Sequence, residues 1–158
     1  QIKNEWNKKL SGLKILVAED YEINQQVVKL MLEQFGCEVM LAENGEQALK
    51  LYQQYDFDII FMDCQMPVMD GFEATRRIRS LDKFSINKTP IVALTANVTQ
   101  KDKDQCMHAG MDDFVTKPYS EQQLLKALER WTSVNIQSFT QLANQTDHNS
   151  IIVLDETI

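Results

Sequence analysis

The chain has few glycines and few cysteines. Only five glycines occur in 158 residues, and they form no Gly-rich loop of the kind that cradles nucleotide phosphates. The three cysteines, Cys37, Cys64 and Cys106, stand singly without CxxC spacing. This odd, scattered set argues against a disulfide framework or a zinc cluster and predicts reduced thiols. Because the chain has no Gly-rich phosphate loop, we expect neither ATP binding nor a kinase activity within it.

Long apolar runs and an excess of positive charge are also missing. No apolar run approaches the roughly 18 residues that a membrane helix requires. The formal net charge is -7, which disfavours a general affinity for nucleic acid because phosphate neutralisation needs clustered Lys and Arg. The basic run Arg76, Arg77 and Arg79 is expected on a solvent face. A cation or protein partners suit the charge better.

The amino-terminal residues carry no secretory signal. The chain begins with Gln1 and lacks the basic start and apolar middle of a signal peptide. We expect a cytoplasmic piece of a longer chain. That expectation leaves open an inner-membrane anchor elsewhere in the parent protein.

Short apolar runs alternate with longer amphipathic stretches, which is the pattern of a parallel sheet covered by helices. The sequence thus predicts an α/β fold with five strands: Lys14–Ala18, Glu38–Ala42, Asp58–Met62, Ile91–Leu94 and Asp113–Val115. The length suits one compact domain. We assign residues 1–12 to a connector, 13–132 to the domain, and 133–158 to a polar linker and the start of a following helical module.

Helical spacing and capping residues mark the connecting helices. The first helix is predicted from Glu22 to Phe35 and the third from Gly71 to Ser80. We expect the first to bury the face made by Ile23, Val27, Leu30, Met31 and Phe35. The other helices are predicted to begin after the caps Asn44, Thr99 and Ser120, the last with Gln123 in a capping box. Near the end, Leu124, Leu125, Leu128 and Trp131 share a face.

Polar residues stand at the carboxyl ends of four predicted strands. Glu19 and Asp20 follow the first strand, Asp63 the third, Thr95 the fourth and Lys117 the fifth. Ligands bind at this edge of open parallel sheets, so the order 2-1-3-4-5 would bring these residues into one crevice. The pattern predicts a single site built from separate parts of the chain.

The residue types at this edge indicate phosphoryl chemistry. Three carboxylates repel one another unless a cation lies among them, and oxygen ligands of this kind suit Mg2+. A carboxylate such as Asp63 can attack phosphorus to give an acyl phosphate, while the Lys117 ammonium offsets charge on the transferring group. The Thr95 hydroxyl can bond a phosphoryl oxygen afterwards, which makes it a switch candidate.

Four strings carrying these residues resemble the response-regulator receiver family from about Leu13 to Trp131. They occur in order along the chain: Val17–Asp20 (VAED), Met62–Gly71 (MDCQMPVMDG), Ala93–Ala96 (ALTA) and Val115–Pro118 (VTKP). The resemblance implies a flavodoxin-like fold of order 2-1-3-4-5. It implies that Asp63 accepts a phosphoryl group from a partner's phosphohistidine, with slow hydrolysis of the aspartyl phosphate.

The resemblance also implies roles for the other residues. Asp20 and Asp63 would bind Mg2+ directly, Glu19 through water and Gln65 through its backbone carbonyl. The Lys117 side chain would contact the phosphoryl group and Thr95 would be the switch hydroxyl. Phe114 stands where the family has an aromatic that changes rotamer, and the Lys117–Pro118 bond is expected to be cis. Two residues depart from the commonest pattern, Glu19 in place of Asp and Phe114 in place of Tyr.

The expected context is a hybrid sensor histidine kinase. Its partners would be a histidine kinase dimerisation and phosphoacceptor domain and a histidine phosphotransfer domain, without nucleic acid or membrane contact by this domain. A stand-alone response regulator is one alternative. A Mg2+-dependent phosphohydrolase is less favoured because such enzymes often have a second Asp where this chain has Gln65. The intact residue set disfavours a receiver that only binds proteins.

Structural explanations exist for some of these residues. Glu19 and Asp20 have an alternative role as caps of the first helix, and Phe114 has one as a plain core aromatic. Strand alternation predicts that Cys64 points away from the acidic side and packs in the core. Neither His108 nor His148 has a partner at recognisable spacing, and we expect both to be solvated.

Overall fold

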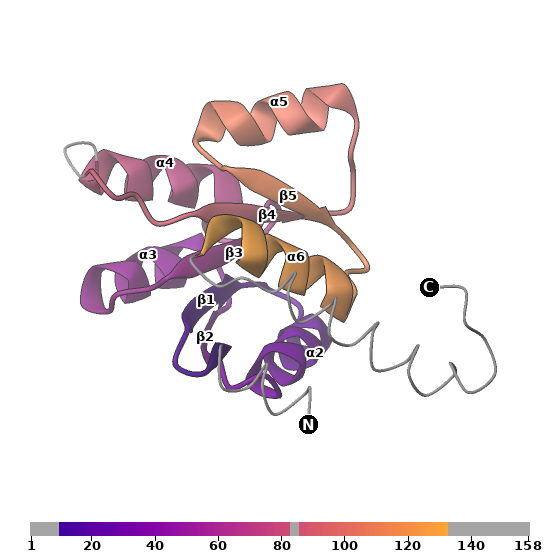
Figure 1. Cartoon of the computed structure of the whole chain (residues 1–158). Coiled ribbons are helices and arrows are strands. Elements are labelled where there is room, and N and C mark those ends of the chain that lie inside the picture. Colours follow the sequence, from indigo (N-terminus) through magenta and orange to yellow (C-terminus); the bar gives the residue numbers. More distant parts are fainter. Residues whose placement is uncertain (1–9, 83–85, 133–158) are drawn as a thin grey trace, which may run out of the picture.

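Five parallel strands form one sheet in the computed structural model, which describes residues 10–82 and 86–132 (Figure 1). The order is β2-β1-β3-β4-β5, so the predicted flavodoxin-like α/β fold is confirmed. The strands are β1 (Lys14–Ala18), β2 (Glu38–Ala42), β3 (Ile59–Asp63), β4 (Ile91–Thr95) and β5 (Asp113–Thr116). Every residue of β3 and β4 is buried, because helices cover both faces of a parallel sheet.

The last three strands end one residue later than predicted. Asp63 closes β3 and lies opposite Leu94, while Thr95 closes β4 and lies opposite Thr116. The hydrophobic pattern did not include the last residue of each strand because Asp63, Thr95 and Thr116 are polar, although the strand pairing continues through them. Asp63 and Thr95 are therefore held by strand hydrogen bonding instead of standing on the loops beyond it.

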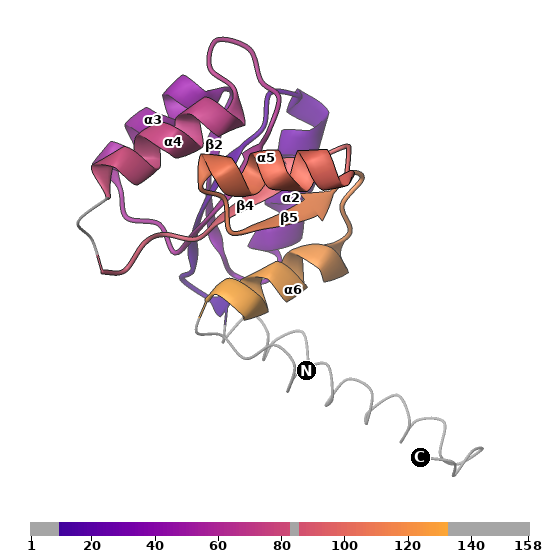
Figure 2. The ribbon, with the colours of Figure 1, turned by 90° about the horizontal axis from the view of Figure 1, so that it is seen from above.

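Within residues 10–82 and 86–132, five helices cover the sheet: α2 (Glu22–Glu33), α3 (Gly45–Gln54), α4 (Gly71–Leu81), α5 (Gln100–Ala109) and α6 (Glu121–Trp131). One core cluster contains Val28 of α2 and Leu124 of α6, and the other contains Ala48, Ala74 and Cys106 of α3, α4 and α5. The sheet thus lies between two helical layers (Figure 2). Leu124, Leu125 and Leu128 are buried in α6, as the helical spacing predicted.

The predicted buried face of α2 is largely wrong. Ile23 and Leu30 are 60% and 68% exposed, and Val27 is 39% exposed. The residues that α2 buries are Gln25, Val28 and Leu32. Apolar residues occupy more than one face of this helix, so helical periodicity alone predicted the wrong face to be buried. Phe35 is buried as expected, but it lies beyond the helix end.

The predicted caps are confirmed. The Asn44 side chain accepts a hydrogen bond from Gln47 N, and Thr99 and Ser120 each form a capping box. A further cap was not predicted: Asp70 precedes α4 and accepts from Glu73 N at 2.8 Å. These caps satisfy backbone N–H groups that a helix start would otherwise leave unpaired.

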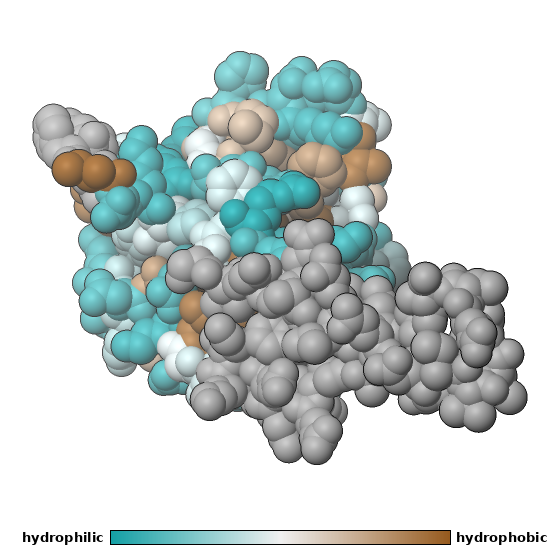
Figure 3. Space-filling view, in the orientation of Figure 1, coloured by the Kyte–Doolittle hydropathy of each residue, from teal (hydrophilic) through white to brown (hydrophobic). Residues whose placement is uncertain are grey.

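The visible face outside the grey atoms is mainly hydrophilic, with small separate hydrophobic patches (Figure 3). Within residues 10–82 and 86–132, none of the helices has both the length and the apolar character for crossing a bilayer. The assignment of residues 133–158 to a linker, and most of the connector 1–12, falls outside the described residues.

Candidate functional site

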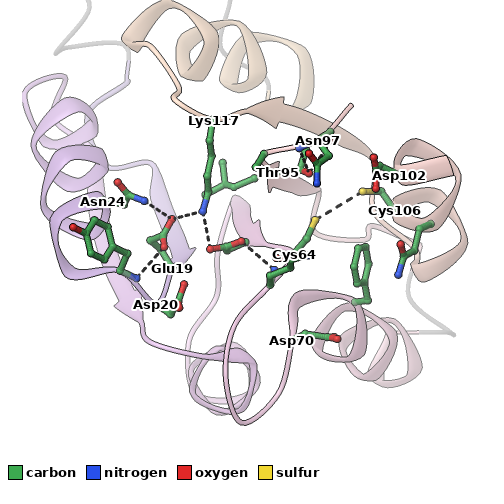
Figure 4. A pocket seen from close by; sticks show the side chains of 17 residues that line it. Glu19, Asp20, Asn24, Cys64, Asp70, Thr95, Asn97, Asp102, Cys106 and Lys117 are labelled. Atoms are coloured by element: carbon green, nitrogen blue, oxygen red, sulfur yellow. Dashed lines mark hydrogen bonds and ion pairs between the residues drawn. The ribbon is translucent and has the colours of Figure 1, made fainter. Parts of the chain in front are cut away.

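The carboxyl edge of the sheet holds a cavity of about 360 Å3 (Figure 4). It is lined by the predicted residues Glu19, Asp20, Asp63, Thr95 and Lys117, which come from the ends of β1, β3, β4 and β5. The sheet order brings them together, because β3 lies between β1 and β4 at the centre of the sheet. The prediction of one convergent crevice is confirmed.

Lys117 joins two of the carboxylates in this cavity. Its Nζ lies 2.8 Å from Asp63 Oδ2 and 3.0 Å from Glu19 Oε1. The Lys117–Pro118 peptide bond is cis, as predicted, and Lys117 N donates to Thr95 O at 2.8 Å. The ammonium therefore reaches both carboxylates from a backbone segment fixed to β4.

Backbone and side-chain donors orient Glu19, whose side chain is fully buried. Tyr21 N donates to Glu19 Oε2 at 2.9 Å, and Asn24 Nδ2 donates to Oε1 at 3.4 Å. The buried Gln25 amide donates to the Glu19 carbonyl at 2.6 Å. Sequence reasoning missed Asn24 and Gln25. The sequence offered one signal for Gln25: its polar side chain stands near the start of a helix that follows the acidic pair.

Glu19, Asp20 and Asp63 form a group suited to a metal ion. One oxygen from each lies within 4.8 Å of the others. Asp20 is exposed, unlike the other two, and α2 begins after Tyr21 without any side-chain cap. The capping explanation of Asp20 and Glu19 is therefore wrong. Three carboxylates face one ammonium here, and a divalent cation would balance the remaining negative charge.

Burial and hydrogen bonding set the ionisation of the site. Burial raises the pKa of Asp63 to about 6, against the opposing effect of Lys117 and of Gln65 N. Burial also tends to raise the pKa of Glu19, but Tyr21 N–H and the Lys117 ammonium outweigh it and lower that pKa. Burial tends to lower the pKa of Lys117, yet its two carboxylate partners raise it. Lys117 thus remains charged between two carboxyl groups whose pKa values are shifted in opposite directions.

Thr95 and Gln65 lie beside the Asp63 carboxylate. The Thr95 hydroxyl donates to Asn97 O at 2.9 Å and accepts from Asn97 N at 3.1 Å. Its hydroxyl is therefore engaged by its own loop. Gln65 N donates to Asp63 Oδ1 at 3.1 Å, so the backbone of this exposed residue borders the cavity, and the metal-binding role of its carbonyl stays a prediction.

Phe114 is half-buried on β5. It packs at the border of the core cluster that contains Leu16 and Cys106, and the Lys103 ammonium lies 5.1 Å from its ring centroid. The ring thus has one side against the core and one side near α5. This position is compatible with both the core and the switch interpretations.

The prediction for Cys64 is half confirmed. Its side chain is buried in a core cluster, as predicted, but it also lines the same cavity as the carboxylates, so the predicted direction away from the acidic side is wrong. Strand alternation failed here because β3 ends at Asp63, so Cys64 already belongs to the loop. Its thiol lies 3.9 Å from that of Cys106 on α5 (Figure 4).

The loop after β3 approaches the site closely at Gly71. Gly71 N donates to Cys64 O at 3.1 Å. A Cβ at position 71 would lie 2.1 Å from the Asp63 carbonyl oxygen. Only glycine therefore allows α4 to begin directly against the end of β3.

Comparison with known proteins agrees with this geometry. Residues 15–129 match the family described as the response regulator receiver domain. The chain belongs to this family. The receiver domain of sensor histidine kinase PA1611 from Pseudomonas aeruginosa, solved with magnesium in its active-site cleft, is 41% identical with a TM-score of 0.69. That match covers 77% of this chain and 98% of the other.

Other relatives are longer proteins or complexes. Sensor protein GacS of Pseudomonas syringae is 39% identical over 79% of this chain, and Histidine kinase 3 of Arabidopsis thaliana is 38% identical over 77% of this chain. The match spans only 14% of each kinase. A co-crystal structure of the Saccharomyces cerevisiae phosphotransfer protein Ypd1 with the Ssk1 receiver domain matches 81% of this chain and 92% of the other, with 33% identity and a TM-score of 0.74.

Proposed function

We propose that this receiver domain accepts a phosphoryl group on Asp63 with the help of Mg2+. The observation that carries the proposal is the placement of Asp63, which shares one cavity with Lys117 at 2.8 Å and with two further carboxylates. A nucleophilic carboxylate, an ammonium and a group of metal ligands are the parts that phosphoryl transfer to an acid requires.

An Asp63 carboxylate oxygen attacks the phosphorus of a partner's phosphohistidine. The new P–O bond forms as the P–N bond breaks, and the imidazole leaves as the neutral histidine after taking up a proton. Lys117 is already beside Asp63 and offsets negative charge on the transferring oxygens. Burial disfavours charge on Asp63 in the absence of a cation.

Asp20, Asp63 and the Gln65 carbonyl would hold Mg2+, with Glu19 acting through a water molecule. The oxygen-rich set fits this hard cation, which keeps several waters and accepts phosphate oxygens. When bound, the ion neutralises charge that develops on the phosphoryl group. Two observations support this assignment: the close carboxylate group and the magnesium in the cleft of the similar PA1611 receiver.

Thr95 is the proposed switch residue. Its hydroxyl bonds Asn97 in the described state, and an acyl phosphate on Asp63 would offer a stronger, charged acceptor nearby. Exchange of one partner for the other would shift the loop between β4 and α5. Phe114, half-buried on β5, would respond by changing its rotamer.

A histidine phosphotransfer domain is the proposed acceptor or donor partner, alongside a kinase's dimerisation and phosphoacceptor domain. The exposed apolar residues of α2 supply a docking surface, namely Ile23, Val27 and Leu30. They lie at spacings of four and three residues on one side of the helix, which begins two residues after Asp20. An exposed apolar stripe next to a site marks a protein contact.

The proposed context is a hybrid sensor histidine kinase in the cytoplasm. Residues 13–132 would form the receiver, residues 1–12 a connector and residues 133–158 a linker into a phosphotransfer module. The relatives that are histidine kinases support this arrangement. The receiver itself would contribute only phosphoryl uptake and slow hydrolysis.

Intact mass after incubation with acetyl phosphate tests the proposal. We expect the gain of one phosphoryl group when Mg2+ is present, no gain with EDTA, and no gain in Asp63→Asn. Asp58→Asn is the matched control, because Asp58 lies at the opposite end of β3 and is expected to behave as wild type. Absence of an adduct in folded wild-type protein, with acetyl phosphate and with a phosphorylated phosphotransfer domain, would overturn the proposal.

A further inference from the structure

Two buried thiols from distant parts of the chain meet in the wall of the site cavity. Cys64 Sγ and Cys106 Sγ lie 3.9 Å apart, and their residues are 5% and 3% exposed. Cys64 follows Asp63 directly, whereas Cys106 comes from α5. Both line the cavity that also contains Glu19 and Lys117, so a small solute that enters the site reaches them.

We propose that Cys64 and Cys106 form an oxidation site at which a peroxide converts the two thiols into an intramolecular disulfide. Hydrogen peroxide is the class of oxidant that the cavity admits, because it is small and polar. A disulfide bond is about 2.05 Å long, so the two sulfurs must approach by roughly 2 Å. The two thiols already contact each other, so no other side chain has to be displaced before the sulfurs approach.

The chemistry needs only the two thiols and one peroxide. The Cys106 sulfur attacks one peroxide oxygen, the O–O bond breaks, and the leaving hydroxide takes the thiol proton as water. The resulting sulfenic acid is attacked at sulfur by Cys64. The S–S bond forms as the S–O bond breaks, and the departing hydroxide leaves as water with the Cys64 proton. The two thiols lose two electrons and the peroxide gains them.

Hydrogen bonding favours Cys106 as the attacking sulfur. The bond with the Cys64 thiol lowers the pKa of Cys106 despite its burial, and the thiolate is the nucleophilic form. The third cysteine offers a contrast. Cys37 lies in the other core cluster, its thiol faces Leu10 O at 3.8 Å, and burial raises its pKa to about 12.

The disulfide would restrain α5 against the end of β3. The Cys64 backbone is fixed on both sides, because its N–H donates to Leu94 O and its carbonyl accepts from Gly71 N, each at 3.1 Å. The approach of the sulfurs must therefore come mainly from α5. The segment between Thr95 and α5 is four residues long, so a held helix limits how far Thr95 can move toward a modified Asp63.

Slower phosphoryl uptake is the expected consequence, and this step rests on the proposed function. The disulfide itself does not, because mass spectrometry detects it without any phosphodonor. The formation of the disulfide and its effect on phosphoryl uptake can therefore be refuted independently. A reduced protein that takes up no phosphoryl group would overturn the proposed function and leave the cross-link result standing.

The test treats the whole chain with hydrogen peroxide, followed by blocking of free thiols and peptide mapping. We expect a loss of two hydrogens, a peptide that links Cys64 to Cys106, and full reversal by dithiothreitol. Cys37→Ala should behave as wild type, whereas Cys64→Ala and Cys106→Ala should give no such link. Oxygen addition at either cysteine without the link, a link through Cys37, or no change in mass would overturn the site.

The second readout is the rate of phosphoryl uptake from acetyl phosphate before and after oxidation. We expect a slowing of about tenfold in wild type and in Cys37→Ala, within the usual range for coupling between two sites. Cys106→Ala should show no effect of peroxide. Equal rates in the reduced and fully cross-linked wild type would overturn the regulatory part.

Discussion

Lys117 Nζ lies 2.8 Å from Asp63 Oδ2, so the ammonium is already paired with the carboxylate that we propose as the phosphoryl acceptor. The same ammonium is 3.0 Å from Glu19, whose side chain has no exposure to solvent. Lys117 thus stabilises two acidic groups that the fold forces together. Its side chain is 22% exposed, so part of its charge is screened by water.

Replacing Lys117 with Met should destabilise the metal-free domain. The substitution keeps the side-chain length but leaves two buried carboxylates without their counter-charge. We expect a loss of about 2–3 kcal/mol in the free energy of unfolding, somewhat less than the roughly 3–5 kcal/mol for breaking a fully buried pair, because Lys117 is partly exposed. Urea unfolding in EDTA at neutral pH measures it.

The control for this substitution is Lys126→Met on the exposed side of α6. It should change stability by less than about 0.5 kcal/mol. Mg2+ should recover part of the stability of Lys117→Met because the ion replaces the missing positive charge. Equal stability of Lys117→Met and wild type in EDTA would contradict this account of the pair.

The pKa of Asp63 predicts a pH-dependent stability. Folding raises this pKa from 3.8 to about 6, so the folded state holds a proton that the unfolded state has lost. Stability therefore falls as pH rises through this window, and the cost is fully present above pH 6. Asp63→Asn lacks this cost. Without metal at pH 7 it should be more stable than wild type by on the order of 2 kcal/mol.

Thermal unfolding in EDTA from pH 4 to pH 7.5 checks that prediction. The difference between Asp63→Asn and wild type should be small at pH 4, grow toward pH 7, and shrink when Mg2+ is added at pH 7. Lower stability of Asp63→Asn than of wild type at pH 7 in EDTA would show that the ion pair with Lys117 outweighs the cost of burial.

The sheet could be predicted from sequence because its strands are short, continuous apolar runs. Lys14–Ala18 and Glu38–Ala42 have the predicted bounds, since apolar side chains on both faces of each strand pack against the two core clusters. The α2 face could not be predicted, because Ile23 and Leu30 are as apolar as Val28 and Leu32. Only tertiary packing decides which of the two sets meets the sheet.

The positions of the site carboxylates could be predicted from the strand ends, but the side-chain contacts around them could not. The amide of Gln25 reaches Glu19 O because α2 turns back and packs against β2, a path that no local pattern encodes. The contact between Cys64 and Cys106 joins residues 42 positions apart. It depends on where α5 docks, which no local pattern encodes.

Thr95 should separate phosphoryl uptake from the conformational response. Thr95→Val keeps the shape but removes the hydroxyl, so we expect Asp63 still to take up the phosphoryl group, more slowly than in wild type, while the loop response is lost. Thr95→Ser retains the hydroxyl and serves as the control. Backbone amide chemical shifts of Asn97 with and without a phosphoryl mimic measure the response. A full response in Thr95→Val would rule out the proposed switch role.

Gly71 should tolerate no side chain. The methyl group of Gly71→Ala would meet the Asp63 carbonyl oxygen at 2.1 Å, which forces β3 and α4 apart. We expect a loss of about 3 kcal/mol or more, beyond ordinary overpacking, together with weaker Mg2+ binding. Ser80→Ala, at an exposed position of the same helix, should be nearly neutral. Urea unfolding and calorimetric titration with Mg2+ measure both effects, and wild-type behaviour of Gly71→Ala would contradict the assigned contact.

The most direct measurement locates the phosphoryl group chemically. Borohydride reduces an acyl phosphate to an alcohol, so a phosphorylated aspartate becomes homoserine. After incubation with acetyl phosphate and Mg2+, followed by reduction and peptide sequencing by mass spectrometry, the account predicts homoserine at position 63 alone. Homoserine at position 20, or a phosphoryl group on a histidine or serine with Asp63 unchanged, would contradict the claim that Asp63 is the acceptor.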